Sequence, residues 1–425
     1  MILRLLSNKV DEAAVVKTMQ KNYMARFANN EVTIFKHWTS ESLYLYLARG
    51  RRALYIDMSG GLDIQMLERE VSRLSTLPED PLYVPLGGPT PGGYQESEED
   101  PERLVDLVKT AVDNTEGVER NAGATRMVYL AVEYEDTAGR TGRYSLNKIF
   151  LTMRSFAGEL SVTNTTAGRW GVDAKRLAVA NSQLLSLARG LPKKRVEAVK
   201  TRLLLSPIVF GHLMGEVATH WANGIEVIAQ TSRYTTEDLG KAVASENLTL
   251  VEKTYDQQAY GFTPFDFEGT PPRRVEIFNR GLLKEFIHNR RTAARLGVES
   301  TGHALGGWVR PSPGHVEVPP GDIPHDVEIL MAELKRGYYI HNNWYTRYQN
   351  VKTGQFSTVG RDLSLEVVDG RPVAVVKFVR IVDTLEGVVK NVTALSKEAE
   401  QIYWWDMAVP ATAPYAILQD VGIAT

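Results

Sequence analysis

Residues that could bind a metal occur together in one stretch of the sequence, Gly211-His-Leu-Met-Gly-Glu-Val-Ala-Thr-His-Trp221. His212, Glu216 and His220 follow one another at intervals of four residues, so on a helix their side chains share a face about 80° wide. Two imidazoles and a carboxylate on that face could bind zinc, or the carboxylate could act as a base toward a bound water. The spacing also fits an amphipathic helix whose His and Glu side chains only cap, pair or fill an interface. The spacing alone leaves both interpretations open.

The composition removes several classes of chemistry. The 425 residues include no Cys, which excludes disulfides, thiolate zinc ligands, iron–sulfur clusters and cysteine nucleophiles. Lys and Arg total 49 against 51 Asp and Glu, and the net charge of −2 gives no global attraction to nucleic acid or to an anionic membrane. No apolar run approaches the roughly 18 residues of a membrane span, and the first residues turn polar too soon for a secretory signal. We therefore expect a cytoplasmic protein without a membrane or nucleic-acid partner.

The N-terminal part alternates helical and extended patterns. Apolar periodicity predicts helices at residues 9–21, 62–77, 104–112, 174–189 and 193–202. Extended runs are predicted at 33–37, 43–47 and 53–56, separated by breaks at 39–42 and 50–52, and as a long hairpin of 127–134 with 144–156. Residues 78–101 are rich in Pro, Gly and acidic residues and are predicted to form a long surface loop. Residues 1–190 are thus predicted to be an α+β domain with helices packed on an antiparallel sheet.

The second half begins with one apolar helix, around residues 208–221, which carries the His and Glu residues. Short strands and turns follow, with strands predicted at 248–252, 274–278, 283–288, 363–368 and 373–379. We therefore expect residues 191–425 to form a mainly antiparallel β domain, a sandwich or a barrel-like sheet. The fold class of the whole chain is α+β.

Six segments in order along the chain carry a resemblance to a known family. They are Ala-Asn-Asn-Glu-Val-Thr-Ile at 28–34, Gly-Ala-Thr-Arg-Met-Val-Tyr-Leu at 123–130 with the strand at 143–158, Val-Ala-Ser-Glu-Asn-Leu-Thr-Leu at 243–250, Asp-Phe-Glu-Gly-Thr-Pro at 266–271, Asn-Arg-Gly-Leu-Leu-Lys at 279–284 with Ser-Thr-Gly-His-Ala at 300–304, and Lys-Thr-Gly-Gln-Phe-Ser at 352–357. Through these segments the sequence resembles the TldD/TldE (PmbA) metallopeptidase family over nearly its whole length.

The resemblance implies a zinc motif that is incomplete in this chain. Active TldD-type members bind zinc through His-Glu-x-x-x-His and a cysteine near the C-terminus. The Glu of this motif falls on Glu216 and its second His on His220, but its first His falls on Gly215, and the chain has no Cys. Two of three protein ligands are therefore missing, and His212 could replace the lost imidazole only if the helix turns it toward the same pocket. The resemblance implies an inactive TldE-type subunit that binds no metal or other cofactor itself.

The resemblance further implies a cytoplasmic assembly with a TldD-type metallopeptidase subunit, as a heterodimer or larger, or else a homodimer. The zinc is expected in the partner subunit, and the substrate is an unfolded or extended peptide. Two alternatives stay open. The chain could itself be a zinc metallopeptidase with a displaced site of His212, Glu216 and His220. It could also be a homo-oligomeric peptide-binding scaffold without an enzymatic role.

Two other groups of residues have mainly structural interpretations. Asp266 and Glu268 offer two carboxylates, but a turn in which Gly269 adopts a positive φ explains the segment as well as a catalytic pair does. Aromatic residues gather around Arg347 and near the C-terminus, at 338–348 and 403–405. Because the chain has no basic excess, these aromatic residues are predicted to form an apolar interface or a peptide-binding surface, not a base-stacking platform.

Overall fold

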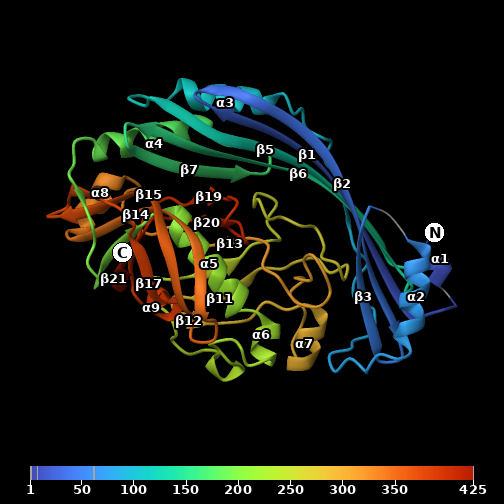
Figure 1. The fold of residues 1–425 in the computed structure, drawn as a ribbon. Coiled ribbons are helices and arrows are strands. Elements are labelled where there is room, and N and C mark those ends of the chain that lie inside the picture. The colour runs from blue at the N-terminus through green and yellow to red at the C-terminus, as the bar shows by residue number, and fades with distance from the viewer. Residues whose placement is uncertain (1, 7, 61–62, 425) are drawn as a thin grey trace.

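A long, curved antiparallel sheet arches over a compact C-terminal part in the computed structural model, which describes residues 2–6, 8–60 and 63–424 (Figure 1). The predicted α+β class is confirmed. No helix among these residues is long and apolar enough to cross a membrane.

The N-terminal sheet has the strand order β3-β2-β1-β5-β6-β4, and β7 also pairs with β6. Its strands are β1 (Glu12–Ala28), β2 (Glu31–Arg49), β3 (Arg52–Ser59), β4 (Gly93–Tyr94), β5 (Arg120–Asp136), β6 (Thr141–Ala157) and β7 (Leu160–Gly168). Its helices are α1 (Ile2–Leu6), α2 (Ile64–Leu74), α3 (Arg103–Asp113) and α4 (Ala174–Ala188). Helices α2, α3 and α4 and the β5–β6 hairpin confirm four of the sequence predictions, because each helix buries one apolar face as its periodicity indicates.

The helix predicted at residues 9–21 is wrong, since this segment belongs to β1. Ala13 and Val15 pack into one apolar cluster and Ala14 and Val16 into another, so the strand is buried on both faces. A continuous apolar run of this kind cannot be told from a helix by periodicity alone. The predicted break at 39–42 is also absent, because residues 31–49 form the single strand β2.

The helix predicted at residues 193–202 is wrong as well. The segment contributes the two-residue strand β8 (Lys193–Lys194) and the start of β9 (Val199–Leu205). Leu203, Leu204 and Leu205 are fully buried in the C-terminal part, where β9 pairs with β14 and β21. The tertiary pairing of these leucines outweighs the helix propensity of the Lys and Arg residues that precede them.

The C-terminal part contains a closed barrel of five strands. Around the ring, β9 pairs with β21, β21 with β17, β17 with β15, β15 with β14, and β14 with β9. Its other strands are β14 (Gly337–Asn350), β15 (Gln355–Val368), β17 (Arg380–Thr384) and β21 (Ala416–Ala424), with β16 (Arg371–Val376) and β18 (Val392–Leu395) added outside the ring. The predicted barrel-like sheet is therefore confirmed, and β15 and β16 confirm the predicted strands at 363–368 and 373–379.

A second sheet lies beside the barrel, with strand order β12-β11-β10-β13-β20-β19. These strands are β10 (Leu250–Glu252), β11 (Val275–Asn279), β12 (Leu282–Leu283), β13 (Val316–Glu317), β19 (Glu400–Ile402) and β20 (Ala411–Ala413). The remaining helices are α5 (Pro207–His220), α6 (Gly224–Ile228), α7 (Arg290–Leu296), α8 (Val327–Leu334), α9 (Leu385–Lys390) and a 3₁₀ turn at Thr236–Asp238. The strand predicted at 283–288 is mostly irregular, because Phe286 and Ile287 are buried without a continuous ladder.

An aromatic cluster joins the curved sheet to the C-terminal part. Phe265 packs on Tyr134 and Tyr144 of the sheet, and Phe267 packs on Tyr44 of the sheet. Between the two phenylalanines, the Asp266 carboxylate accepts hydrogen bonds from the backbone N–H groups of Glu268, Thr270 and Ala304. Gly269 has φ +73°, as the turn interpretation predicted. The segment is thus a rigid turn that presents aromatic rings to the sheet.

Replacing Gly269 by Ala tests this turn. A Cβ at this position would lie 2.7 Å from Pro91 Cγ in a left-handed backbone conformation, so we expect a loss of about 2–4 kcal/mol of unfolding free energy. The matched control is Gly139→Ala, which has φ +79° but no atom within 4 Å of the added Cβ. This control should lose only about 1–2 kcal/mol from the backbone conformation. Equal losses of the two variants in chemical denaturation would contradict the packing role.

Candidate functional site

Helix α5 carries the predicted metal-motif residues through the core of the C-terminal part. Ser206 begins the helix, because its hydroxyl accepts the Val209 N–H, and Pro207 occupies the first turn. The helix packs between the barrel and the second sheet in one large apolar cluster, and most of its residues are buried. The sequence prediction of an apolar helix at 208–221 is confirmed.

Gly211 and Gly215 form the face of α5 that approaches β20 and the segment before it. A Cβ on Gly211 would lie 2.9 Å from Ala411 Cβ, and a Cβ on Gly215 would lie 3.2 Å from Val409 Cβ. Val409 is 5% exposed. A side chain at position 215 would therefore be crowded at its Cβ by a buried isopropyl group.

His212, Glu216 and His220 come together on a neighbouring face, as their spacing predicts. His212 Nε2 lies 3.7 Å from Glu216 Oε1, and His220 Nε2 lies 3.4 Å from Glu216 Oε2. The side chains of His212 and Glu216 are only 4% and 14% exposed. Both imidazoles thus direct their Nε2 atoms at the same carboxylate.

Two residues of β14 complete this group and were not predicted as site residues. The Tyr348 hydroxyl donates to Glu216 Oε2 at 2.9 Å, and the Asn343 amide donates to His212 Nδ1 at 3.2 Å. With Nδ1 as acceptor, the His212 proton is placed on Nε2, facing Glu216. Tyr348 stood in the aromatic group noted in the sequence, but nothing in the sequence links it to Glu216.

The charges of the group favour an ionised Glu216. Burial alone would raise the pKa of this carboxyl, but hydrogen bonds from His212 and His220 hold it well below its usual value. Burial, together with the charge of Glu216, raises the pKa of the Tyr348 hydroxyl, so this hydroxyl stays a donor. Burial also raises the pKa of Asp406, a neighbouring carboxyl that accepts the backbone N–H of Tyr345.

These residues do not fit a zinc ion. In the resembling motif the first ligand position falls on Gly215, where an added Cβ would lie 3.2 Å from Val409 Cβ, so Val409 crowds any side chain at this position. The remaining nitrogen donors, His212 and His220, are both engaged with Glu216, which also accepts from Tyr348. Across residues 2–6, 8–60 and 63–424, no three His, Asp or Glu side chains are arranged as metal ligands. The arrangement is a His–Glu–His network in which the Glu216 carboxylate lies between two imidazoles and a tyrosine hydroxyl.

A second buried His–Glu pair lies elsewhere in the C-terminal part. His303 Nε2 lies 2.6 Å from Glu252 Oε2, and both side chains are fully buried. Glu252 also accepts backbone N–H groups from Thr254, Gly314 and His315. Burial raises the pKa of Glu252, but the His303 charge and hydrogen bond lower it to about 2. Because both oxygens of Glu252 accept hydrogen bonds, the pair holds the loops around β10 and β13 together. Glu252 and His303 are too far apart in the sequence for their spacing to predict this pair.

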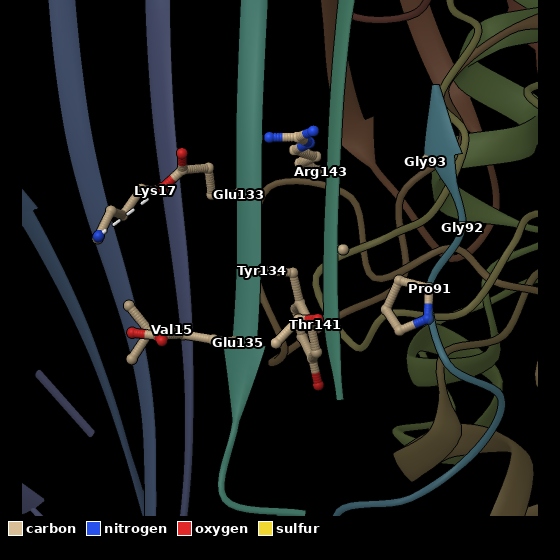
Figure 2. A pocket seen from close by; sticks show the side chains of 11 residues that line it. Val15, Lys17, Pro91, Gly92, Gly93, Glu133, Tyr134, Glu135, Thr141 and Arg143 are labelled. Atoms are coloured by element: carbon tan, nitrogen blue, oxygen red, sulfur yellow. Dashed lines mark ion pairs between the residues drawn. The ribbon is translucent and has the colours of Figure 1, made fainter. Parts of the chain in front are cut away.

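A cavity of about 400 Å³ lies on the N-terminal sheet, away from α5 (Figure 2). It is lined by Val15, Lys17, Pro91, Gly92, Gly93, Glu133, Tyr134, Glu135, Thr141, Gly142 and Arg143. Lys17 and Glu133, which lie side by side in Figure 2, form an exposed ion pair of 3.8 Å. An exposed pair of this kind contributes little, and the lining offers no imidazole or thiol for catalysis.

The curved sheet and the barrel define a fold that solved structures share. The structure of TldE from Thermococcus kodakarensis has a TM-score of 0.82, with 17% sequence identity, over 100% of this chain and 99% of that chain. The C-terminal domain of PmbA/TldA metallopeptidases matches residues 198–425. The chain therefore belongs to the PmbA/TldD metallopeptidase family.

Sequence relatives match over shorter stretches. A metalloprotease of Methanocaldococcus jannaschii is 27% identical over 208 residues, which are 47% of this chain and 44% of that protein. The metalloprotease PmbA of Escherichia coli O157:H7 is 33% identical over 98 residues, 23% of this chain and 20% of that protein. The matches thus span less than half the length of these relatives.

Glu216→Gln tests the His–Glu–His network. At neutral pH the variant should lose about 1–3 kcal/mol of unfolding free energy, because two imidazoles and a hydroxyl lose a charged acceptor. The lowered pKa of Glu216 means that its contribution is complete above the ordinary value of 4.5 and is lost as the pH falls below it. The difference between wild type and variant should therefore shrink from about pH 5 to about pH 3.

The measurement is chemical denaturation at several pH values. Glu246→Gln, an exposed Glu on the same part of the molecule, is the matched control and should change stability by less than about 0.5 kcal/mol. A loss for Glu216→Gln that is independent of pH would contradict an ionised Glu216 in the native state.

Proposed function

We propose that this chain is a non-catalytic, TldE-type subunit of a TldD/TldE metallopeptidase assembly that processes unfolded or extended peptides. The observation that carries the proposal is the packing of Gly215 against Val409, at the position where the resembling motif has its first zinc ligand. The engagement of Glu216 by His212 and His220 supports it further. The peptidase zinc would then reside in the partner subunit.

In this proposal the chain contributes structure and binding surface. The assembly would act in the cytoplasm, and the chain would contribute to it as two domains, residues 1–190 and 191–425. Extended peptides suit such a protein, because the backbone of an extended chain can add to a sheet edge without a requirement for a particular sequence.

The free edge of β2 supports an assembly with a second subunit. In the part of the chain that the structure describes, residues 31–40 pair with β1 on one side and with no strand on the other. All ten are exposed, and they include Val32, Ile34, Phe35 and Trp38, which are 37–45% exposed. Soluble proteins seldom leave a long apolar edge uncovered, because such an edge pairs readily with other chains. We infer that a TldD-type partner, or a second copy in a homodimer, covers it.

The assay of the proposal combines metal content with peptidase activity. The purified chain alone should hold well below one zinc per molecule by elemental analysis and should not hydrolyse an unfolded polypeptide. Mixing with a TldD-type partner should give chelator-sensitive hydrolysis. Hydrolysis by the chain alone, lost on Glu216→Gln or His220→Ala, would instead establish the displaced zinc site. Self-association without any association with the partner would favour the scaffold.

Phe35→Asp tests the β2 edge. A charge at this position opposes burial against another subunit, so we expect the dissociation constant of the assembly to rise at least about tenfold. Ile329→Asp on α8 is the matched control, since the two side chains are 45% and 46% exposed. Analytical ultracentrifugation measures both variants. An unchanged dissociation constant for Phe35→Asp would place the interface elsewhere.

A further inference from the structure

Three cations lie against aromatic rings where the curved sheet faces the C-terminal part. The Arg126 guanidinium lies 5.0 Å from the Trp38 ring, the Lys148 ammonium 5.6 Å from the Tyr260 ring, and the Arg361 guanidinium 4.7 Å from the Trp344 ring. We name these six residues the cation–aromatic surface. Three of them come from the strands β2, β5 and β6 of the curved sheet. The other three come from the segment after β10 and from the β14–β15 hairpin, and these two parts of the chain lie under the arch of the sheet in Figure 1.

Ring contacts extend from two of the three pairs to the segment 403–405. Tyr260 stacks on Tyr403 with ring centroids 4.9 Å apart. Burial raises the pKa of the Tyr260 hydroxyl, and the charge of Arg126 acts in the opposite direction. Two residues after Tyr403, Trp405 lies 6.5 Å from Trp344. The segment 403–405 therefore lies between the Tyr260 pair and the Trp344 pair.

The cations of this surface have no anionic partner within the described residues. Arg126, Lys148 and Arg361 form no ion pair there, whereas the nearby Arg154 pairs with Asp362. Arg126 donates only to the Asn22 side chain, and its Nε is buried without a hydrogen-bond partner. Burial, and then the charge of Arg169, lowers the pKa of Lys148 to about 8. An unpaired cation in such surroundings is stabilised when an anion binds beside it.

The surface ends at the network on α5. Trp344 follows Asn343, which donates to His212, and the next residue, Tyr345, donates its backbone N–H to Asp406. Trp405 is 62% exposed and Tyr345 is 47% exposed. Exposed rings at this end can take apolar side chains, while the cations behind them take carboxylates.

We propose that the cation–aromatic surface binds acidic segments of an extended peptide and leads them toward the face of α5. This inference rests on the proposed function, and it names the class of peptide that this subunit selects. A guanidinium group binds a carboxylate through two parallel N–H···O hydrogen bonds. Aromatic faces pack against apolar side chains without selecting a particular sequence. The net charge of −2 does not favour a phosphate polymer as the occupant.

The experiment is a titration of the chain alone, measured by fluorescence anisotropy of a labelled peptide. The chain is used without a partner because, in the proposed function, it does not hydrolyse the peptide by itself. Three dye-labelled peptides of about 12 residues, roughly 40 Å when extended, alternate Leu with Asp, Asn or Lys. We expect the Asp peptide to bind at least about tenfold more tightly than the Asn peptide, and the Lys peptide to bind most weakly. The preference should decrease as the salt concentration rises from about 0.05 M to about 0.3 M.

The double variant Arg126→Gln/Arg361→Gln should lose about tenfold in affinity for the Asp peptide and little for the Asn peptide. Arg295→Gln/Arg336→Gln removes two exposed arginines elsewhere and is the matched control. Arg361→Lys keeps the charge and should retain most of the preference, which separates a charge effect from misfolding. Circular dichroism verifies the fold of each variant.

Equal affinities for the Asp and Asn peptides would overturn the inference, as would a preference that survives the double variant. Tighter binding of a single-stranded DNA oligonucleotide than of the Asp peptide would also overturn it, in favour of a nucleic-acid surface. These outcomes are independent of the mixing assay with a TldD-type partner. A chain that activates the partner without preferring acidic peptides would keep the proposed function and lose only this inference.

Discussion

The close approach of helix α5 to the strand β20 is the constraint on which the site depends. Gly211 and Gly215 allow this approach, because side chains at these positions would meet Ala411 and Val409. Once the helix is held there, its next face turns toward β14, where Glu216 lies between two imidazoles and a tyrosine hydroxyl. A carboxylate so placed is stable in the core because hydrogen bonds compensate for its burial. The same packing that stabilises the helix thus removes the space for a zinc ligand at Gly215.

The curved sheet gives this core a second surface. Aromatic residues of the Asp266–Gly269 turn fix one end of the sheet to the C-terminal part, and the rest of its inner face remains partly exposed. Along that face lie cations for which the described part of the chain offers no ion pair, and at its margin lies the stretch of β2 that pairs with no second strand among the described residues. In the proposed function, this surface would supply an interface and a path for an extended chain.

The sequence predicted those features that depend on local pattern. Helices α2, α3 and α4 have the periodicity that their burial requires, α5 has the apolar run of a buried helix, and the spacing of His212, Glu216 and His220 predicted their common face. β1 was missed because both of its faces are apolar, and β9 because barrel closure outweighs the helix propensity of its Lys and Arg residues. Asn343 and Tyr348 could not be predicted as neighbours of α5, because they lie 131 and 132 residues from their partners and only the closed barrel brings them there. The cation–aromatic pairs could not be predicted either, since in each pair the ring and the cation come from different elements that only the fold brings together.

The most direct measurement of the central claim is anomalous diffraction at the zinc absorption edge from crystals of this chain grown with excess zinc. The account predicts no anomalous peak between His212 and His220, and a Glu216 carboxylate that still lies between both imidazoles and accepts from Tyr348. An ordered peak at that position, with His212 Nε2, His220 Nε2 and Glu216 turned onto the ion at about 2.0–2.2 Å, would contradict it.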